Sequence, residues 1–147
     1  MFFEDIELNR SYQGRDFVVR KEDIFAFGRL CLDEHPIHSD EEFARTSEFG
    51  GIVAHGLYGL SLMAGLKGEL KLHIDSSIAS LGWNNVRFSR PIYPDRTVFV
   101  RTTPVSMRLT SRPGRGIVTH AVELIEKDGE ILVEGEHVLL LRTREAA

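Results

Sequence analysis

The sequence predicts a single α+β domain in which a curved antiparallel sheet wraps around one long buried helix. Two observations lead to this prediction: helical patterns fill the first half of the chain, and strand patterns separated by turn residues fill the second half. Strands that follow one another through tight turns pair antiparallel, and a sheet with one apolar face needs a second layer to cover it. No internal repeat or linker interrupts the pattern, so we assign residues 1–147 to one domain.

A short strand over Asp16–Val19 is expected to precede the first helix. From Lys21 onward, apolar and small residues recur with the 3.6-residue period of one helix face, at Ile24, Phe27, Gly28 and Cys31. This helix should end near Leu32, because the residue before Pro36 is biased away from helical backbone angles.

Two more helices are expected before the strands begin. Ser39 resembles a helix N-cap with Glu42 three residues later, which predicts a short helix over residues 40–45. Residues 56–70 contain almost no polar side chain before Lys67, a pattern typical of a helix that is buried on most sides. The small residues of this segment would let the sheet backbone approach closely: Gly59, Ser61, Ala64 and Gly65.

The second half of the chain predicts strands with alternating apolar residues, each followed by turn signals. The expected strands cover residues 86–92, 97–109, 118–124 and 131–141. Asp128-Gly129 lies between the last two strands and predicts a two-residue hairpin turn. His120 and His137 lie on apolar strand faces and are expected to be hydrogen-bonded core histidines, whereas His73 is expected at the surface.

Charge and composition exclude several classes of protein. A net charge of −4 argues against nucleic acid as the main partner, because phosphate binding needs a basic face. Local basic groups such as Arg87 and Arg90 are either solvated sheet-edge charges or contacts for the phosphates of a nucleotide-bearing thiol, and Arg87 is kept as a candidate substrate contact.

The chain carries no sign of export or membrane insertion. A single cysteine excludes an intramolecular disulfide, and Glu4 and Asp5 stand where a signal peptide would carry positive charge. No apolar run approaches the roughly 20 residues that span a bilayer. We therefore expect a cytoplasmic protein with no membrane partner.

The stretch Asp33-Glu34-His35-Pro36-Ile37-His38 carries the strongest chemical signal. A carboxylate and an imidazole flank backbone that a proline restrains, and two such groups can share one water, as general acid–base catalysis requires. Asp33 and His38 are the candidate catalytic pair, and His35 and Pro36 are candidate substrate contacts. Taken alone, the pair could also be a capping aspartate and a surface histidine. A divalent metal on Asp33, His35 and His38 is a further alternative, but no metal is expected, because Pro36 argues against a helix that presents both imidazoles.

His55-Gly56 stands at the expected start of the long helix. Free N–H groups at a helix start stabilise negative charge, and glycine lets a substrate carbonyl approach the backbone. Gly56 is therefore the candidate donor to a developing oxyanion, and His55 either lines the site or orients the turn. Leu57 and Leu60 are candidates for the wall of a narrow apolar channel beside the helix.

Three stretches of the chain together resemble the MaoC-like dehydratase family, which includes the (R)-specific enoyl-CoA hydratases. They are Asp33–His38 with the following Phe43-Ala44, Ile52–Leu57, and Asn85–Asp95, and the likeness covers roughly Asp16 to Leu141. The resemblance implies a hot-dog fold, normally dimeric with the sheets joined. It also implies that Asp33 and His38 hold and activate a water, and that the Gly56 amide donates to a thioester carbonyl.

The chain departs from the family's pattern at several positions. His35 stands where asparagine is common, and Cys31-Leu32 stands where a small residue and glycine are common. Ala64 replaces a serine that some members carry, and Pro94 replaces a glycine. None of these changes removes the candidate catalytic pair, but those at His35 and Ala64 bear on the substrate.

The leading hypothesis is a homodimeric lyase that adds water to a 2-enoyl thioester or removes it from a 3-hydroxyacyl thioester. The carrier would be coenzyme A or acyl carrier protein; no cofactor is expected, because coenzyme A is part of the substrate. Two alternatives stay open. A hot-dog thioesterase would use a carboxylate on the long helix, where Glu69 is the only one before Leu70. A non-catalytic acyl-CoA-binding module would keep the fold without turnover.

Overall fold

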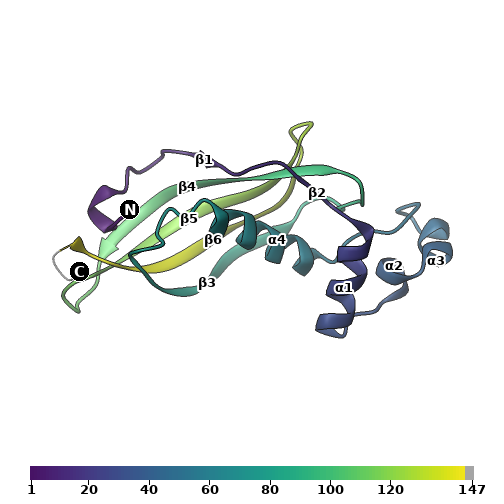
Figure 1. The fold of residues 1–147 in the computed structure, drawn as a ribbon, viewed down its shortest axis with the longest axis horizontal. Helices are drawn as coiled ribbons and strands as arrows, with labels where there is room; N and C mark the ends of the chain where they lie inside the picture. The colour runs from purple at the N-terminus through teal and green to yellow at the C-terminus, as the bar shows by residue number, and fades with distance from the viewer. Residues whose placement is uncertain (145–147) are drawn as a thin grey trace.

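In the computed structural model, which describes residues 1–144, one antiparallel sheet curves along a single long helix (Figure 1). The helices are α1 (Lys21–Cys31), α2 (Pro36–Ser39), α3 (Glu41–Thr46) and α4 (Gly56–Glu69), with a 3-10 turn η1 at Phe3–Asp5. The strands are β1 (Tyr12–Gln13), β2 (Phe17–Val18), β3 (Ser77–Phe88), β4 (Thr97–Leu109), β5 (Arg115–Glu126) and β6 (Ile131–Arg142). They pair in the order β1-β4-β5-β6-β3, with β2 also beside β4, which confirms the α+β hot-dog arrangement.

The core lies between α4 and the face of the sheet that it covers. Met63 of α4 is fully buried, as are Val100, Leu124 and Val133 on three neighbouring strands. Burying one such side chain contributes roughly 1.5–3 kcal/mol. The small residues were expected to let the sheet backbone approach, but the close neighbours of Gly59 are side chains: an added Cβ would lie 2.5 Å from Ile92 Cδ1 and 2.8 Å from Val133 Cγ2. At Gly65 the expectation is wrong, because no neighbouring atom lies within 4 Å of such a Cβ.

The short helices differ from the sequence prediction in one element and one cap. Helix α1 ends as expected, with Leu32 in the left-handed conformation at φ 64°. Residues 36–39, for which no helix was predicted, form the one-turn helix α2, because Pro36 occupies its first position and His35 caps it. The N-cap of α3 is Asp40, whose side chain accepts a hydrogen bond from the Phe43 N–H; the prediction of Ser39 was wrong.

The strands differ from the sequence prediction in two further features. Strand β3 begins at Ser77, well before the expected Val86, and Gly82 and Asn85 within it have positive φ values. These backbone kinks accompany register shifts against β6, so the strand does not alternate regularly and its first part was missed. The turn between β5 and β6 spans residues 127–130 rather than two residues, with Gly129 at φ 103°.

The buried histidines match the sequence prediction only in part. His120 is fully buried and bonded to Thr102, as expected for a core histidine. His137 is half-buried and bonded to Ser80. The prediction that His73 lies at the surface was wrong. Its side chain is 7% exposed, and its Nε2 lies 3.2 Å from Nε2 of His120.

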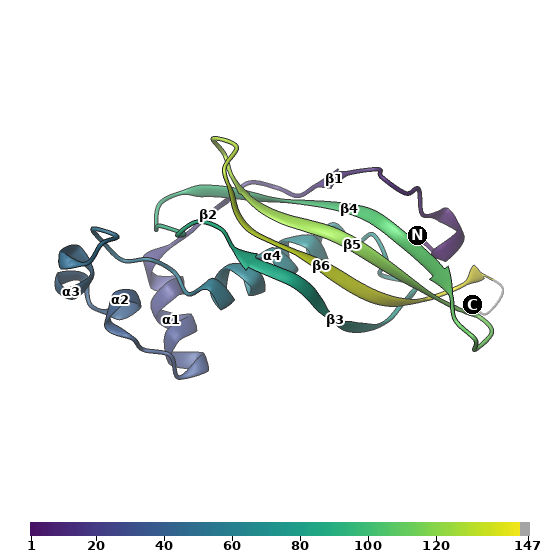
Figure 2. The same cartoon turned by 180° about the vertical axis from the view of Figure 1, so that it is seen from behind.

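The three short helices gather beyond one end of the sheet, next to the N-terminal end of α4, and both termini lie at the other end (Figures 1 and 2). The start of α4 therefore meets the segment from α1 to α3, and the residues singled out in the sequence lie at this junction.

Within residues 1–144, no helix is both long enough and apolar enough to cross a membrane.

Candidate active site

Asp33, His38 and His55 lie together at the junction of α1, α2 and α4. One ligand atom from each lies within 4.8 Å of the others. One water can bridge two polar atoms at such a separation, since each of its hydrogen bonds spans about 2.8 Å. The carboxylate and the imidazole from the Pro36 segment are thus close enough to share a water, and their joint action on it stays a prediction.

The His38 ring is held in one orientation. Its Nδ1 lies 2.6 Å from the carbonyl oxygen of Val53, and a carbonyl only accepts, so Nδ1 carries the proton. In the neutral ring Nε2 is then an acceptor that is free to hold a water. Burial lowers the pKa of His38 below its usual 6.5, which favours this neutral form.

The backbone around His38 is fixed by local hydrogen bonds. The His35 ring accepts from the Ile37 N–H at 3.2 Å, and the Ser39 hydroxyl donates to the Glu34 carbonyl at 3.0 Å. The Val53 carbonyl is placed by its neighbour Ala54, whose N–H donates to the Ile92 carbonyl at 2.8 Å. The pairing of His38 with Val53 therefore joins two segments that are each restrained independently.

His55 orients the turn that carries Asp33. The residue is 3% exposed, and its Nε2 donates to the Asp33 backbone carbonyl at 2.7 Å. Its ring lies against the His38 ring, with centroids 3.8 Å apart. Gly28 of α1 leaves space for the hydrogen bond between His55 and the Asp33 carbonyl, because a Cβ added at Gly28 would lie 2.9 Å from that carbonyl oxygen. Both roles left open for His55 fit the structure: its ring holds the Asp33 turn, and it lines the small polar cavity next to Asp33 and His38.

Gly56 opens α4 and lines an adjacent cavity of about 320 Å³. As the first helical residue, its N–H has no acceptor within the helix. His38 lines the same cavity, whose walls are mainly apolar and include Phe49, Phe88 and Val133. The Phe88 ring lies so close that a Cβ on Gly56 would meet it at 2.5 Å. An acyl group in this cavity would contact apolar walls and find one free backbone donor.

His38 is the residue that connects the two parts of the site. It lines both the Gly56 cavity and a smaller, more polar cavity of about 140 Å³ that contains Asp33 and His55. A water held between Asp33 and His38 would therefore stand beside the apolar cavity.

The other candidate substrate contacts do not line the Gly56 cavity. His35 is exposed and caps α2, and Pro36 begins that helix. Leu57 is 59% exposed, Leu60 packs against the core, and Arg87 is exposed on β3 opposite Glu134. Their roles in substrate binding stay predictions.

Sequence reasoning missed two kinds of group in the site. The aromatic walls Phe49 and Phe88 come from a loop and a strand end, where no periodic signal points to a cavity. The Val53 carbonyl is a backbone group, so no residue type could indicate it; the nearest signal was the resemblance over Ile52–Leu57.

A metal would find three candidate ligand residues here, one carboxylate and two imidazoles, but few of their ligand atoms are free. Nδ1 of His38 and Nε2 of His55 are each bonded to a backbone carbonyl. The free His55 nitrogen, Nδ1, is buried and has no hydrogen-bond partner. Since one nitrogen of each ring is already bonded to a carbonyl, the donor set suits hydrogen bonding better than tetrahedral coordination. The expectation of no metal stays a prediction.

Comparison with known proteins places the chain in a family. The model of the MaoC like domain matches residues 5–125, which is most of the chain. The chain belongs to the MaoC-like domain family. A relative from Aeromonas caviae, described as (R)-specific enoyl-CoA hydratase, is 29% identical over 119 residues, covering 81% of this chain and 84% of the relative. The matches to three further relatives cover 30%, 43% and 35% of the length of those relatives.

Two solved structures share this fold over nearly the whole chain. A MaoC-like dehydratase from Rhodospirillum rubrum superposes with a TM-score of 0.88 at 26% identity, covering 98% of both chains. An Archaeoglobus structure described as monoamine oxidase regulatory protein superposes with a TM-score of 0.91 at 29% identity, covering 97% of this chain and 95% of that one. These findings confirm the resemblance seen in the sequence.

Proposed function

We propose that this MaoC-like chain adds water to 2-enoyl thioesters and removes it from 3-hydroxyacyl thioesters, with Asp33 and His38 activating the water. The observation that carries the proposal is the approach of the Asp33 carboxylate to the His38 ring, next to a mainly apolar cavity that His38 and Gly56 line. The relative named (R)-specific enoyl-CoA hydratase supports the reaction class.

In the hydration direction, Asp33 takes a proton from the water, and the oxygen of that water bonds to the β-carbon of the enoyl group. The electron pair of the double bond moves onto the thioester carbonyl, where the Gly56 N–H stabilises the negative charge. His38, through Nε2, holds the attacking oxygen. The proton that Asp33 has taken then passes to the α-carbon, so one water is added and both side chains return to their starting state.

A direct assay tests this proposal. The purified protein is mixed with crotonyl-CoA, and loss of the conjugated enoyl absorbance is followed. Free thiol, measured in the same samples, separates hydration from thioester hydrolysis. Tight binding without either signal would contradict the proposal and favour an acyl-binding module.

The thioesterase alternative finds no support at its candidate carboxylate. Glu69 lies at the far end of α4 from Gly56 and is held in an ion pair with Arg15 at 2.7 Å. Its carboxylate is thus committed to a surface partner rather than to the candidate site. The homodimer implied by the resemblance stays a prediction.

The pH dependence should follow His38. Burial lowers the pKa of His38, so its neutral, water-holding form persists below the ordinary value of 6.5 and is lost as the pH falls further. We expect kcat/KM for crotonyl-CoA to be flat from pH 8 down to about 6.5 and to decline only below that. The NMR titration of the His38 ring, assigned by comparison with His38→Gln, should have its midpoint below 6.5. A midpoint above that value would contradict this assignment.

Gly28→Ala should impair the site without touching a catalytic group. The new methyl group would crowd the Asp33 carbonyl oxygen and the His55 ring, and so displace the Asp33 turn. We expect kcat/KM to fall by about 10- to 100-fold, since small misplacements of catalytic groups are costly. Circular dichroism and thermal melting should show a folded protein. A normal rate would mean that the turn shifts without consequence.

A further inference from the structure

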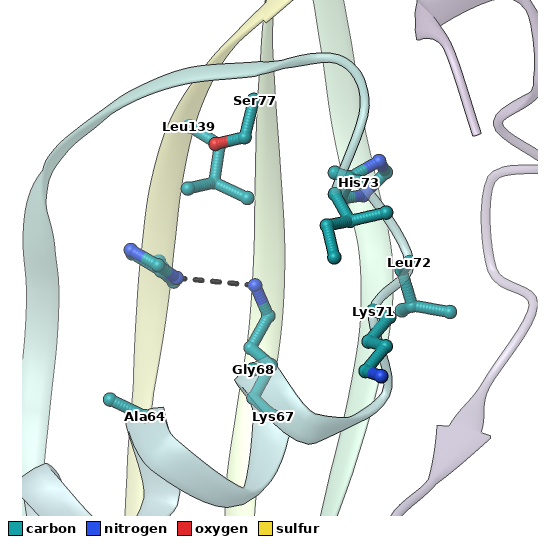
Figure 3. A pocket seen from close by; sticks show the side chains of 10 residues that line it. Ala64, Lys67, Gly68, Lys71, Leu72, His73, Ser77 and Leu139 are labelled. Carbon is teal, nitrogen blue, oxygen red and sulfur yellow. Dashed lines mark hydrogen bonds between the residues drawn. The ribbon is translucent and has the colours of Figure 1, made fainter.

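A second cavity lies at the C-terminal end of α4, away from the candidate active site (Figure 3). Its volume is about 250 Å³, and it is bounded by α4, the turn that follows, β3 and β6. Lys67, His73 and His137 supply polar groups, and Ala64 and Leu139 supply apolar surface. The proposed reaction uses none of these residues.

Lys67 is the unusual group in this cavity, because it is a buried cation. The residue is 8% exposed, and its side chain points into the cavity (Figure 3). None of the ion pairs formed within residues 1–144 includes it. Burial lowers the pKa of Lys67 to about 8, so at pH 7 the ammonium still outnumbers the amine roughly tenfold. Buried charges in proteins are normally paired, and here the described chain provides no anion.

His137 orients the Lys67 ammonium without adding charge. Nζ of Lys67 donates to Nδ1 of His137 at 3.1 Å, and Nε2 on the other side of that ring lies 2.8 Å from the Ser80 hydroxyl. The Trp83 ring stacks on the His137 ring, with the two centroids 4.3 Å apart. Burial lowers the pKa of His137 to about 4, so the ring is neutral. An ammonium has three N–H donors, and His137 is its one acceptor among the described residues, which leaves two donors for a ligand.

We propose that this cavity binds a carboxylate group through the Lys67 ammonium. A carboxylate has the missing charge and can accept both remaining N–H bonds. The cavity is smaller than typical drug-sized sites, so it suits a small acid or the end of a chain rather than a nucleotide. Methylene groups next to the carboxylate would contact Ala64 and Leu139.

The position of the cavity indicates that this carboxylate is the far end of an acyl group, an assignment that rests on the proposed function. Both cavities lie between α4 and the β3–β6 pair, one at Gly56 and the other at Lys67. At 1.5 Å per residue, the Cα atoms of Gly56 and Lys67 are about 16 Å apart along the helix. The Cα–Cβ bonds of a helix tilt toward its start. A medium-length acyl chain that is anchored at Gly56 would run along this side of α4 to reach the Lys67 ammonium. The substrate class is then a 2-enoyl thioester with a terminal carboxylate.

Binding of two saturated thioesters tests this without requiring turnover. Suberoyl-CoA and octanoyl-CoA have equal chain length and differ by the terminal carboxylate. By calorimetry, we expect the wild type to bind suberoyl-CoA at least about tenfold more tightly, and Lys67→Met to lose this advantage while keeping octanoyl-CoA binding. Methionine has similar length and removes the buried charge, so the variant should fold, which thermal melting checks.

Lys71→Met is the matched control. It removes one positive charge from the same cavity rim, but its side chain is directed away from Lys67 (Figure 3). We expect it to keep the preference for suberoyl-CoA within about twofold, because an exposed charge contributes little.

The outcomes separate this proposal from the catalytic one. Equal binding of both thioesters by the wild type, or an advantage that survives in Lys67→Met, would overturn it. If suberoyl-CoA binds in a Lys67-dependent way but 2-octenedioyl-CoA is not hydrated, the carboxylate site stands and the catalytic proposal fails. The carboxylate could instead belong to a free acid, which binding of suberate tests. Lys67-dependent binding of suberate, with no advantage for suberoyl-CoA, would overturn the acyl assignment in favour of a free acid.

Discussion

We expect Asp33→Asn and His38→Gln each to lower kcat for crotonyl-CoA hydration by about 10²–10⁴-fold, the usual contribution of a positioned acid or base. Asparagine keeps the shape of Asp33 but cannot take the proton of the attacking water. Glutamine at position 38 can still donate to the Val53 carbonyl, but it lacks the ring nitrogen that would hold the water. Initial rates, measured as loss of enoyl absorbance, check both changes.

Glu34→Gln is the matched control for this prediction. It removes the neighbouring exposed carboxylate, and we expect its rate within about twofold of the wild type. Thermal melting should show all three variants folded, because the changed side chains are exposed or half-buried. A near-normal rate in either Asp33→Asn or His38→Gln would remove the proposed mechanism.

The second large effect is expected for Gly56→Ala. The added Cβ would meet the Phe88 ring at 2.5 Å, so either the ring or the start of α4 must move. Loss of one oxyanion donor typically costs about 10²–10³ in kcat, and displacement of the Gly56 N–H should cost a similar factor. Steady-state kinetics with crotonyl-CoA would give this value.

Gly65→Ala offers the control, because it lies on the same helix with no atom within 4 Å of the new Cβ. We expect unchanged kinetics and about 0.5–1 kcal/mol of added stability, as is usual when alanine replaces a helical glycine. Equal kinetics in Gly56→Ala and Gly65→Ala would contradict the role assigned to the Gly56 amide.

Periodicity predicted the elements whose burial is regular. The long helix over 56–70 was found because it is apolar on almost every side, and β4 was predicted at its observed ends, Thr97 and Leu109. Strand β3 was found only in part, because Gly82 and Asn85 adopt positive φ values that interrupt alternation. A pattern with period two cannot reveal a strand that bends in this way.

The site was predictable where it depends on side-chain type within a short stretch. Asp33 and His38 lie five residues apart in sequence, so their approach required only local geometry. The buried position of His73 beside His120 depends on contacts across the fold, and a single sequence gives no signal for such a pair. Lys67 stood out as the first charge on an apolar helix, but its lack of an anionic partner became visible only in three dimensions.

The bends of β3 bear on how this protein avoids aggregation. Beyond its pairing with β6, β3 is the last strand in the sheet order, and a long straight edge would accept any unpaired strand that meets it. The irregular steps near Gly82 and Asn85 break the even spacing of donors and acceptors that an incoming strand would need. Because β3 carries these steps, its outer edge is a poor template for the regular addition of further strands, so the same kinks that hid the strand from its sequence pattern also protect the sheet.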